Sequence, residues 1–132
     1  MTSSTEIPKD AVPARKPGKR ALPAEIRTAV KAAQSKKGED ICVLDLRTAS
    51  TFTDYFLIVR GNSSRQNAAL SDAIGLELKN AGLRPIGVEG TAHGEWVLMD
   101  YGYFVVHVFS QAARDYYALE KLWGDAPRAD FR

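Results

Sequence analysis

Three aspartates in or beside predicted strands are the side chains best placed for metal-dependent chemistry. Asp45, Asp54 and Asp100 lie where phosphoryl and nucleotidyl transferases carry their metal-binding carboxylates. No predicted strand contains an Asp-x-Asp pair, and the segment GNSSR at 61–65 lacks the glycine density and the lysine of a phosphate-binding loop. We therefore favour roles at strand ends and turns for these carboxylates. A metal-dependent nucleotidyltransferase stays open as a rival hypothesis, and it requires the three carboxylates to converge.

The residues that could act as nucleophile, base or metal ligand are few. Cys42 lies in the apolar run ICVLDLR, where a thiol is expected to be buried and inert. The serines at 63–64 have no nucleophile-elbow pattern and are better explained as a helix cap. Two histidines, His93 and His107, do not make a zinc site without a cysteine cluster. For His107 we favour a packed interface histidine over an acid–base group. We expect no enzymatic activity, no metal and no cofactor.

The charge of the chain is concentrated at its start. Residues 1–20 hold five basic and two acidic side chains, a net charge of +3, whereas the whole chain carries +2, so the remainder carries −1. A near-neutral domain does not favour a phosphate-driven grip on nucleic acid. We interpret residues 1–22 as a disordered basic tail that makes at most weak RNA contact through RKPGKR at 15–20. The lone cysteine, and the absence of a long apolar run or a signal-like start, favour a cytoplasmic protein.

Hydrophobic periodicity and capping signals predict alternating helices and strands. In chain order, the predicted elements are a helix from Pro23 that Gly38 ends, strands at 41–47 and 54–60, a helix that Ser63 and Gln66 cap and Gly82 ends, a strand at 85–90, a hairpin within 93–109, and a helix from Ser110 to near Gly124. This order predicts an α+β, two-layer domain with one mixed five-stranded sheet and helices mainly on one face. We place the domain at 23–126 and a C-terminal tail at 127–132.

The hairpin HGEWVLMDYGYFVVHVF, residues 93–109, separates two kinds of side chain. A two-residue loop at Tyr101-Gly102 would place Trp96 opposite His107. Paired residues share a face of the sheet, so the loop position assigns every side chain to one side. The face expected under the helices is wholly apolar and carries Val97, Met99, Phe104, Val106 and Val108.

The opposite face of the hairpin is mixed, with aliphatic, aromatic and a few polar groups. It is expected to carry Trp96, Leu98, Asp100, Tyr103, Val105 and His107. This composition is typical of the centre of a protein interface, in which Trp96 would be the anchor. The alternative is that a helix covers this side as well. A shift of one residue in the pairing would exchange the two faces.

Six segments, in this order, resemble the ribosomal silencing factor family, which includes the Iojap-like proteins. They are DICVLDLR, TDYFLIVRGNSSRQ, PIGVEG, GEWVLMDYG, VVHVF and ARDYYALEKLWGDA. The resemblance covers about residues 24–126, and it is the combination that is specific rather than any single segment.

The resemblance implies a compact α/β fold related to nucleotidyltransferases but without known transferase chemistry. It implies binding to the large ribosomal subunit through ribosomal protein L-fourteen, obstruction of small-subunit joining and repression of translation when nutrients are scarce; organelle relatives act in assembly of the large subunit. By motif match, the partner-facing residues include Trp96, Leu98 and Asp100. Together with the rest of the mixed face and the adjoining turn, the expected partner-binding set is Trp96, Leu98, Asp100, Tyr101, Tyr103, Val105 and His107.

Tyr103 departs from the family pattern, because relatives often carry an acidic residue directly after this turn. We predict a non-enzymatic translation repressor that acts sterically. The alternatives are the nucleotidyltransferase above and an RNA-contacting assembly factor of the large subunit. A homodimer through a sheet edge or through the mixed face is also compatible with the sequence, which gives neither the oligomeric state nor the trigger of silencing.

Overall fold

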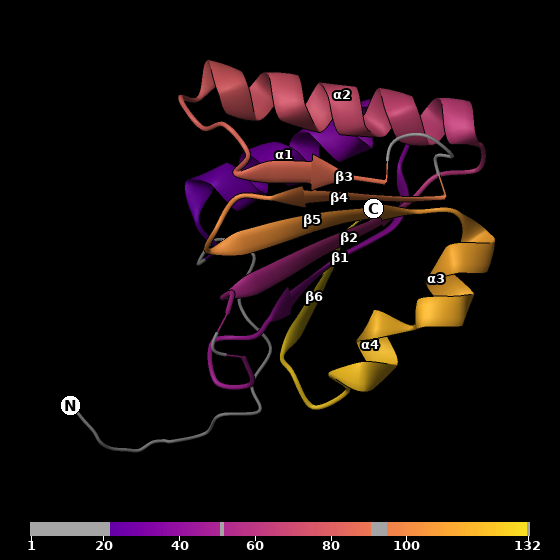
Figure 1. Ribbon diagram of the computed structural model, residues 1–132. Coiled ribbons are helices and arrows are strands. Elements are labelled where there is room, and N and C mark those ends of the chain that lie inside the picture. Colours follow the sequence, from indigo (N-terminus) through magenta and orange to yellow (C-terminus); the bar gives the residue numbers. More distant parts are fainter. Residues whose placement is uncertain (1–21, 51, 91–94, 132) are drawn as a thin grey trace.

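The computed structural model describes residues 22–50, 52–90 and 95–131, which form one mixed sheet with helices packed on it (Figure 1). The elements are α1 (Ala24–Ser35), β1 (Glu39–Asp45), β2 (Tyr55–Arg60), α2 (Ser64–Asn80), β3 (Gly87–Glu89), β4 (Trp96–Asp100), β5 (Phe104–Phe109), α3 (Gln111–Tyr117), α4 (Leu119–Leu122) and β6 (Arg128–Phe131). The predicted α+β class is confirmed. The predicted tail at 1–22 lies outside the described residues except for Leu22, which is buried.

The sheet has six strands among the described residues, in the order β3-β4-β5-β2-β1-β6. The central pair β2–β5 is parallel and the other neighbouring pairs are antiparallel. The five-stranded prediction was one strand short, because residues 128–131 pair with β1 as an edge strand. These residues are too few and too polar to be recognised as a strand from the sequence. The strand forms because it pairs with β1. Residues 128–131 of the segment assigned as a C-terminal tail therefore belong to the sheet.

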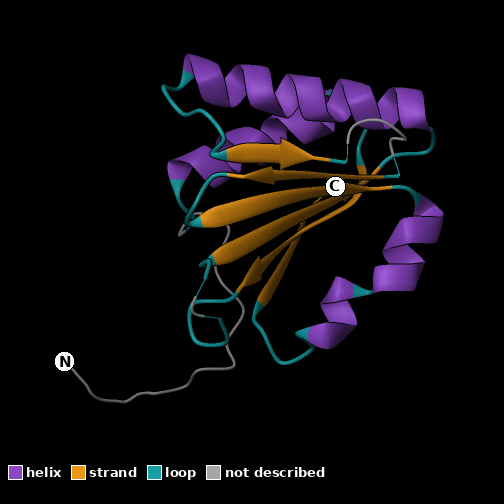
Figure 2. Ribbon diagram, viewed as in Figure 1, coloured by secondary structure: helices purple, strands orange, loops and turns teal. Residues whose placement is uncertain are grey.

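Helices α1 and α2 cover one face of the sheet, as Figure 2 shows. The buried residues of α1 recur at helical spacing, so its apolar stripe faces the strands. At its end, Lys37 adopts a positive φ of 60° and the Gly38 N–H donates to the Ala33 carbonyl at 2.9 Å. Gly38 does not itself supply the left-handed conformation. An added Cβ at Gly38 would lie 2.7 Å from Val59 Cγ1, so close packing against β2 requires glycine here.

The start of α2 confirms the predicted cap. Ser63 Oγ accepts from the Gln66 N–H at 3.0 Å, while Gln66 Oε1 accepts from the Asn62 N–H at 2.6 Å. Gln66 Nε2 also donates to the carbonyls of Lys36 and Lys37. This glutamine therefore ties the beginning of α2 to the end of α1. Gly82, at φ +90°, ends the helix as predicted.

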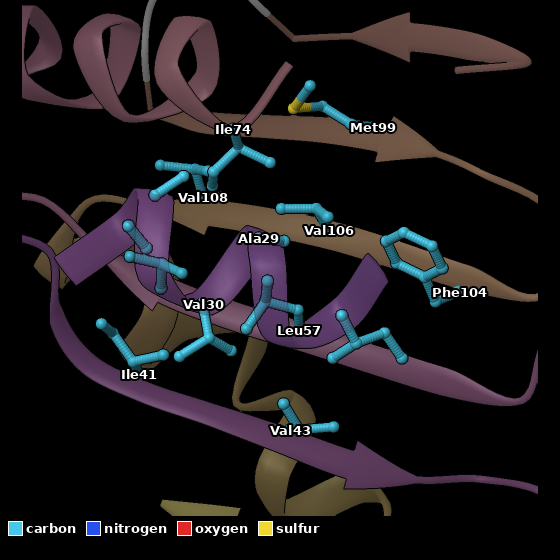
Figure 3. Packing of buried hydrophobic residues seen from close by; sticks show 14 of the residues in the cluster. Ala29, Val30, Ile41, Val43, Leu57, Ile74, Met99, Phe104, Val106 and Val108 are labelled. Atoms are coloured by element: carbon cyan, nitrogen blue, oxygen red, sulfur yellow. The ribbon is translucent and has the colours of Figure 1, made fainter. Parts of the chain in front are cut away.

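The core between α1, α2 and the sheet is built mainly from apolar side chains (Figure 3), and α2 also buries two polar residues, Asn67 and Ser71. The strands contribute alternate residues to it, and the helices contribute their stripes. Among the residues that Figure 3 labels are Ala29, Val30, Ile41, Val43, Leu57, Ile74, Met99, Phe104, Val106 and Val108. The face of the hairpin that the sequence assigned to the helices is the face found there.

The hairpin loop lies one residue later than predicted. Tyr101 donates its N–H to the Phe104 carbonyl at 2.9 Å, so the two-residue loop is Gly102-Tyr103. Leu98 consequently pairs with His107, and Trp96 pairs with Phe109. Moving a loop by one residue moves each cross-strand partner by two, so every side chain of the paired strands stays on its predicted face.

None of the described helices is long and apolar enough to cross a membrane.

Candidate protein-docking surface

The side of the sheet away from α1 and α2, here called the outer face, is most accessible at β4. Along this strand Val97 and Met99 are buried in the helix-side core, whereas Trp96, Leu98 and Asp100 alternate with them and are half-buried. The alternation follows from the period of two in an extended chain. These three residues are the ones that the family motif assigned to the partner.

At β5 the outer face is closed. Val105, His107 and Phe109 are 6%, 3% and 0% exposed, so the structure does not bring the first two to the surface as the predicted partner-binding set required. A second apolar cluster buries them, to which α3 contributes Ala113. The segment from α4 onward adds Leu119, Trp123 and Ala126 as partly buried members of the cluster.

The sequence left two possibilities for the outer face: an open interface or a surface covered by a helix. Each is found in part of the structure. The C-terminal helices cover the middle of the outer face and leave the β4 side half-open. The prediction that helices lie mainly on one face is confirmed, because the two long helices α1 and α2 share one face and only the short α3 and α4 pack on the other. Helix α3 starts beside β4, where the Ser110 N–H donates to the Glu95 carbonyl and Ser110 Oγ donates to the Glu95 carboxylate. Ser110 also caps the helix by accepting from the Ala113 N–H, as predicted.

The predicted final helix is broken in two. Ala118 adopts a left-handed conformation, with φ 47° and ψ 50°, between α3 and α4. This bend brings Trp123 over the outer face, where its ring meets the ring of Phe56 at 5.1 Å in an edge-to-face arrangement. A continuous apolar stripe along the sequence could not reveal the break, because Ala118 is an ordinary helix former.

Trp96 and His107 form the principal polar contact of the outer face. The Trp96 indole N–H donates to His107 Nδ1 at 3.0 Å, and the rings are stacked with centroids 5.9 Å apart. Burial lowers the pKa of His107 to about 4, so the imidazole is neutral near pH 7 and can accept this bond. The predicted alternative, a reach from His107 to Asp100, is not what the structure shows. His107 is packed as predicted, between Phe56 and Phe109, but it lies beneath the surface, where a partner would not touch it.

Two further aromatic residues, Phe56 and Phe52, extend this contact across the outer face. Neither was among the predicted site residues. Phe56 of β2 lies 4.5 Å from the His107 ring and 6.1 Å from the ring of Phe52, which is 65% exposed. The cluster therefore reaches the surface at Trp96 and again at Phe52. The alternation within strand 54–60 was the available signal for Phe56, but a strand buried on both faces gives no clue to which face is which.

The two tyrosines of the hairpin turn do not belong to the outer face. Tyr101 is 5% exposed within the helix-side core, where its ring stacks on Phe104 at 5.0 Å. Tyr103 packs against the same core, and its hydroxyl donates to the Glu25 carboxylate of α1. Both were expected on the partner side, and both placements were wrong because the turn lies at Gly102-Tyr103. Burial and then the bond to Glu25 raise the pKa of Tyr103 well above its usual value.

Asp100 combines a structural contact with partial exposure. Its Oδ1 accepts from the Gly102 N–H at 2.8 Å, an interaction that helps the glycine hold its φ of +89°. Its second carboxylate oxygen has no hydrogen-bond partner within the described ranges. Asp100 can therefore stabilise the turn with one oxygen and accept a bond from a partner with the other.

The edge strand β3 continues the outer face past Asp100. Gly87 pairs with Asp100, and Glu89 pairs with Leu98, so positions 87 and 89 share the outer face. A Cβ added at Gly87 would meet none of the described atoms within 4 Å. The surface beside Asp100 is therefore open, and a docking partner could approach the β3–β4 ladder closely.

Asp45, Asp54 and Asp100 do not form a metal site in the described part of the chain. The described residues contain no group of three His, Cys, Asp or Glu side chains that could hold a metal ion. Asp45 is held by Arg47 through a two-pronged ion pair, with 2.6 Å between Nη2 and Oδ2. Burial alone would raise the pKa of Asp45, but the bonds from Arg47 outweigh it and keep the pKa below its usual value. The nucleotidyltransferase hypothesis needed these carboxylates to converge, and this geometry gives it no support.

A polar hollow of about 550 Å³ lies between α3, α4 and the β1–β6 edge. Its lining mixes both signs of charge. Asp40 is paired with Arg60, and Gln111 donates to the carboxylate of Asp115. Arg114 donates to the Asp40 carbonyl and is buried. These contacts give the hollow a structural role at the junction of the C-terminal helices and the sheet.

Comparisons with known proteins agree with this arrangement. A family model described as "Ribosomal silencing factor during starvation" matches residues 19–132. The ribosomal silencing factor of Bacillus subtilis is 45% identical over 105 residues, which cover 80% of this chain and 89% of that protein. A crystal structure of a protein from Chromobacterium violaceum superposes with a TM-score of 0.74 at 41% identity, over 76% of this chain and 83% of the other. A mouse protein named for mitochondrial assembly of the ribosomal large subunit is 31% identical, over 68% of this chain and 41% of its own length.

Proposed function

The chain belongs to the ribosomal silencing factor family, and from that membership we propose that it binds the large ribosomal subunit through ribosomal protein L-fourteen. Bound there, it blocks joining of the small subunit sterically and represses translation under nutrient limitation. The protein acts in the cytoplasm as a docking module and not as an enzyme. The names of its relatives support the ribosomal part of this proposal, and the outer face supports the docking part.

The single observation that carries the docking surface is the alternation along β4. Trp96, Leu98 and Asp100 are half-exposed on the side of the sheet that the C-terminal helices leave open. A large ring, an aliphatic side chain and a carboxylate in one row give an apolar centre with a polar margin, as protein interfaces have. The β3 side adds open space at Gly87. Val105 lies in the apolar cluster beneath this surface and His107 bonds to Trp96, whereas Tyr101 and Tyr103 pack on the helix side and do not take part.

Co-sedimentation with isolated large and small ribosomal subunits tests the proposal. We expect the chain to sediment with the large subunit alone and to reduce subunit association when added before mixing. Trp96→Ala should weaken binding by about 2 kcal/mol, roughly thirtyfold, because it removes the anchor that docking would bury against the partner. Sedimentation with neither subunit would refute the ribosomal partner.

Leu76→Ala is the matched control for Trp96→Ala. Leu76 is an apolar residue of α2 that is 56% exposed, on the side of the sheet opposite the proposed surface. Its truncation should leave binding to the large subunit and to purified ribosomal protein L-fourteen unchanged. Equal binding of wild type and Trp96→Ala would exclude docking through β4.

The alternatives give different results in the same assays. A nucleotidyltransferase would bind nucleotide and magnesium saturably, and Asp100→Asn would abolish this binding. An RNA-contacting assembly factor would lose most of its affinity on deletion of residues 1–20, with a steep dependence on salt. A homodimer through the outer face would compete with the ribosomal partner, so binding per chain would fall as protein concentration rises.

A further inference from the structure

The position of the Trp96 ring is controlled from the neighbouring strand. Trp96 of β4 and His107 of β5 are diagonal neighbours across the ladder, since His107 pairs with Leu98 two residues further on. Their side chains meet on the outer face through the 3.0 Å bond from the indole N–H to Nδ1. A tryptophan on a strand has several rotamers, and this bond selects one of them.

The His107 ring is itself immobilised. Phe56 meets it edge-on at 4.5 Å, Phe109 stacks on it at 5.7 Å with an interplanar angle of 12°, and only 3% of the residue is exposed. A partner therefore cannot contact His107 directly. A ring that is held by two neighbours is a fixed acceptor for the half-buried Trp96.

Histidine at this buried position lowers the stability of the fold. With Nδ1 accepting from Trp96, the proton of the neutral ring lies on Nε2. His107 Nε2 is buried and has no hydrogen-bond partner in the part of the chain that the structure describes. A phenylalanine or leucine would fill the same apolar space without an unsatisfied polar atom. The imidazole thus leaves Nε2 buried without a partner, while Nδ1 accepts the hydrogen bond from Trp96.

We propose that His107 is a positioning residue for partner recognition: by accepting the indole N–H it fixes Trp96 in its docking orientation and leaves the ring available only as an apolar anchor. This inference rests on the proposed docking through Trp96. It also specifies the chemistry of the partner surface, which must offer apolar side chains over the ring and needs no hydrogen-bond acceptor for the indole. Ordering an anchor before contact removes an entropic cost from binding.

Two substitutions at residue 107 separate hydrogen bonding from packing. His107→Phe keeps a planar ring but removes the acceptor, whereas His107→Asn can place Oδ1 close to where Nδ1 lies. We expect His107→Phe to bind the large subunit roughly threefold to tenfold more weakly, the range associated with ordering one side chain. His107→Asn should recover part of this loss. Val108→Ala, on the opposite face of the same strand, controls for a general loss of stability and should bind as wild type does when folded.

The Trp96 indole N–H resonance in ¹⁵N-labelled protein gives a readout that altered stability alone would not produce. It should be protected from solvent exchange in wild type and His107→Asn and lose protection in His107→Phe, with Trp123→Phe used to assign the two indole signals. Replacing Trp96 by 3-benzothienylalanine, in which sulfur stands in place of the N–H, tests the same bond with His107 intact. This variant should bind as weakly as His107→Phe.

The outcomes separate the two proposals. If Trp96→Ala binds like wild type, docking through Trp96 is wrong. If Trp96→Ala loses binding but His107→Phe and the benzothienyl variant both keep wild-type affinity, the docking surface stands and the positioning role is overturned. Should His107→Phe fail to fold, the benzothienyl variant decides alone.

Discussion

The two faces of one sheet have different compositions and different exposure. The helix-side face is mainly apolar, and α1 and α2 bury most of it. Asp45, which pairs with Tyr55 at the end of β1, is a charged residue on this face. The outer face carries a tryptophan, a histidine and an aspartate, and the short C-terminal helices cover it only in part. The same strands supply both, because neighbouring residues of a strand point to opposite sides. A face that only stabilises the fold can be uniform, whereas one that recognises a partner combines apolar area with oriented polar groups.

The hairpin shows the contrast most directly. Val97 and Met99 are 1% and 4% exposed, while Trp96 and Leu98 beside them are half-buried. If the comparison is right, substitutions on the helix side act on stability, and substitutions on the outer face of β3 and β4 act on binding. The following experiments test this division from the largest expected effect to the smallest.

Truncation in the helix-side core should have the largest effect. Phe104 is fully buried and stacks on Tyr101. Phe104→Ala should lower the free energy of unfolding by about 3–5 kcal/mol, because it leaves a cavity that the packed helices cannot close. Urea titration followed by circular dichroism measures this change. Leu98→Ala, which is half-buried on the outer face, should cost less than about 1.5 kcal/mol; equal losses would break the comparison.

A side chain introduced on the open edge should block docking without affecting the fold. Gly87→Gln places an amide beside Asp100, where the described atoms leave space. Binding to the large subunit should weaken by at least about 2 kcal/mol through steric obstruction, while the unfolding midpoint stays near that of wild type. The matched control is Val88→Gln, one residue along β3 on the helix side and already 45% exposed. Obstruction by both variants, or by neither, would contradict a boundary between the faces at β3.

Acid should lower the free energy of unfolding through the protonation of His107 in the outer face. Its folded-state pKa, lowered by burial to about 4, lies below the ordinary value of 6.5, so the unfolded chain binds the extra proton first as the pH falls. Stability is therefore lost between about pH 6.5 and 4, by about 2 kcal/mol from pH 7 to pH 5. Urea midpoints at these two pH values measure the loss. His107→Phe should show a difference smaller by this amount, and an unchanged pH dependence in that variant would assign the loss to other groups.

The smallest effect is expected at Tyr103. Tyr103→Phe removes the hydroxyl that donates to Glu25, which should lower the free energy of unfolding by about 1 kcal/mol. Because the residue packs on the helix side, binding to the large subunit should not change. A clear loss of binding with normal stability would return Tyr103 to the partner surface, where the sequence alone had placed it.

The sequence predicted the local parts of the fold well. The cap at Ser63, the glycine stop at Gly82 and the apolar face of the hairpin are set by interactions within a few residues, so short patterns reveal them. The strand β6 and the break at Ala118 depend on residues far along the chain. Neither leaves a pattern strong enough to detect, and as a result the C-terminal segment was assigned as a tail.

The candidate site also combines residues that the sequence placed correctly with residues whose position depends on tertiary packing. The motif and the alternation along β4 placed Trp96, Leu98 and Asp100 on one face, and the structure keeps them there. The turn at Gly102-Tyr103 moved Tyr103 to the helices, since its hydroxyl finds Glu25 of α1. Burial of Val105 and His107 could not be foreseen, because it depends on where α3 and α4 pack.

By itself the sequence determined which residues alternate, where helices begin and end, and the family to which the chain belongs, since these depend on local spacing and on the order of segments. Only the tertiary structure decided which part of the outer face stays open. The C-terminal helices fold back over β5 and stop short of β4, and that packing divides one mixed face into a buried aromatic cluster around His107 and a half-exposed row led by Trp96. Burial is a property of what lies opposite a residue, and residues distant in sequence supply it.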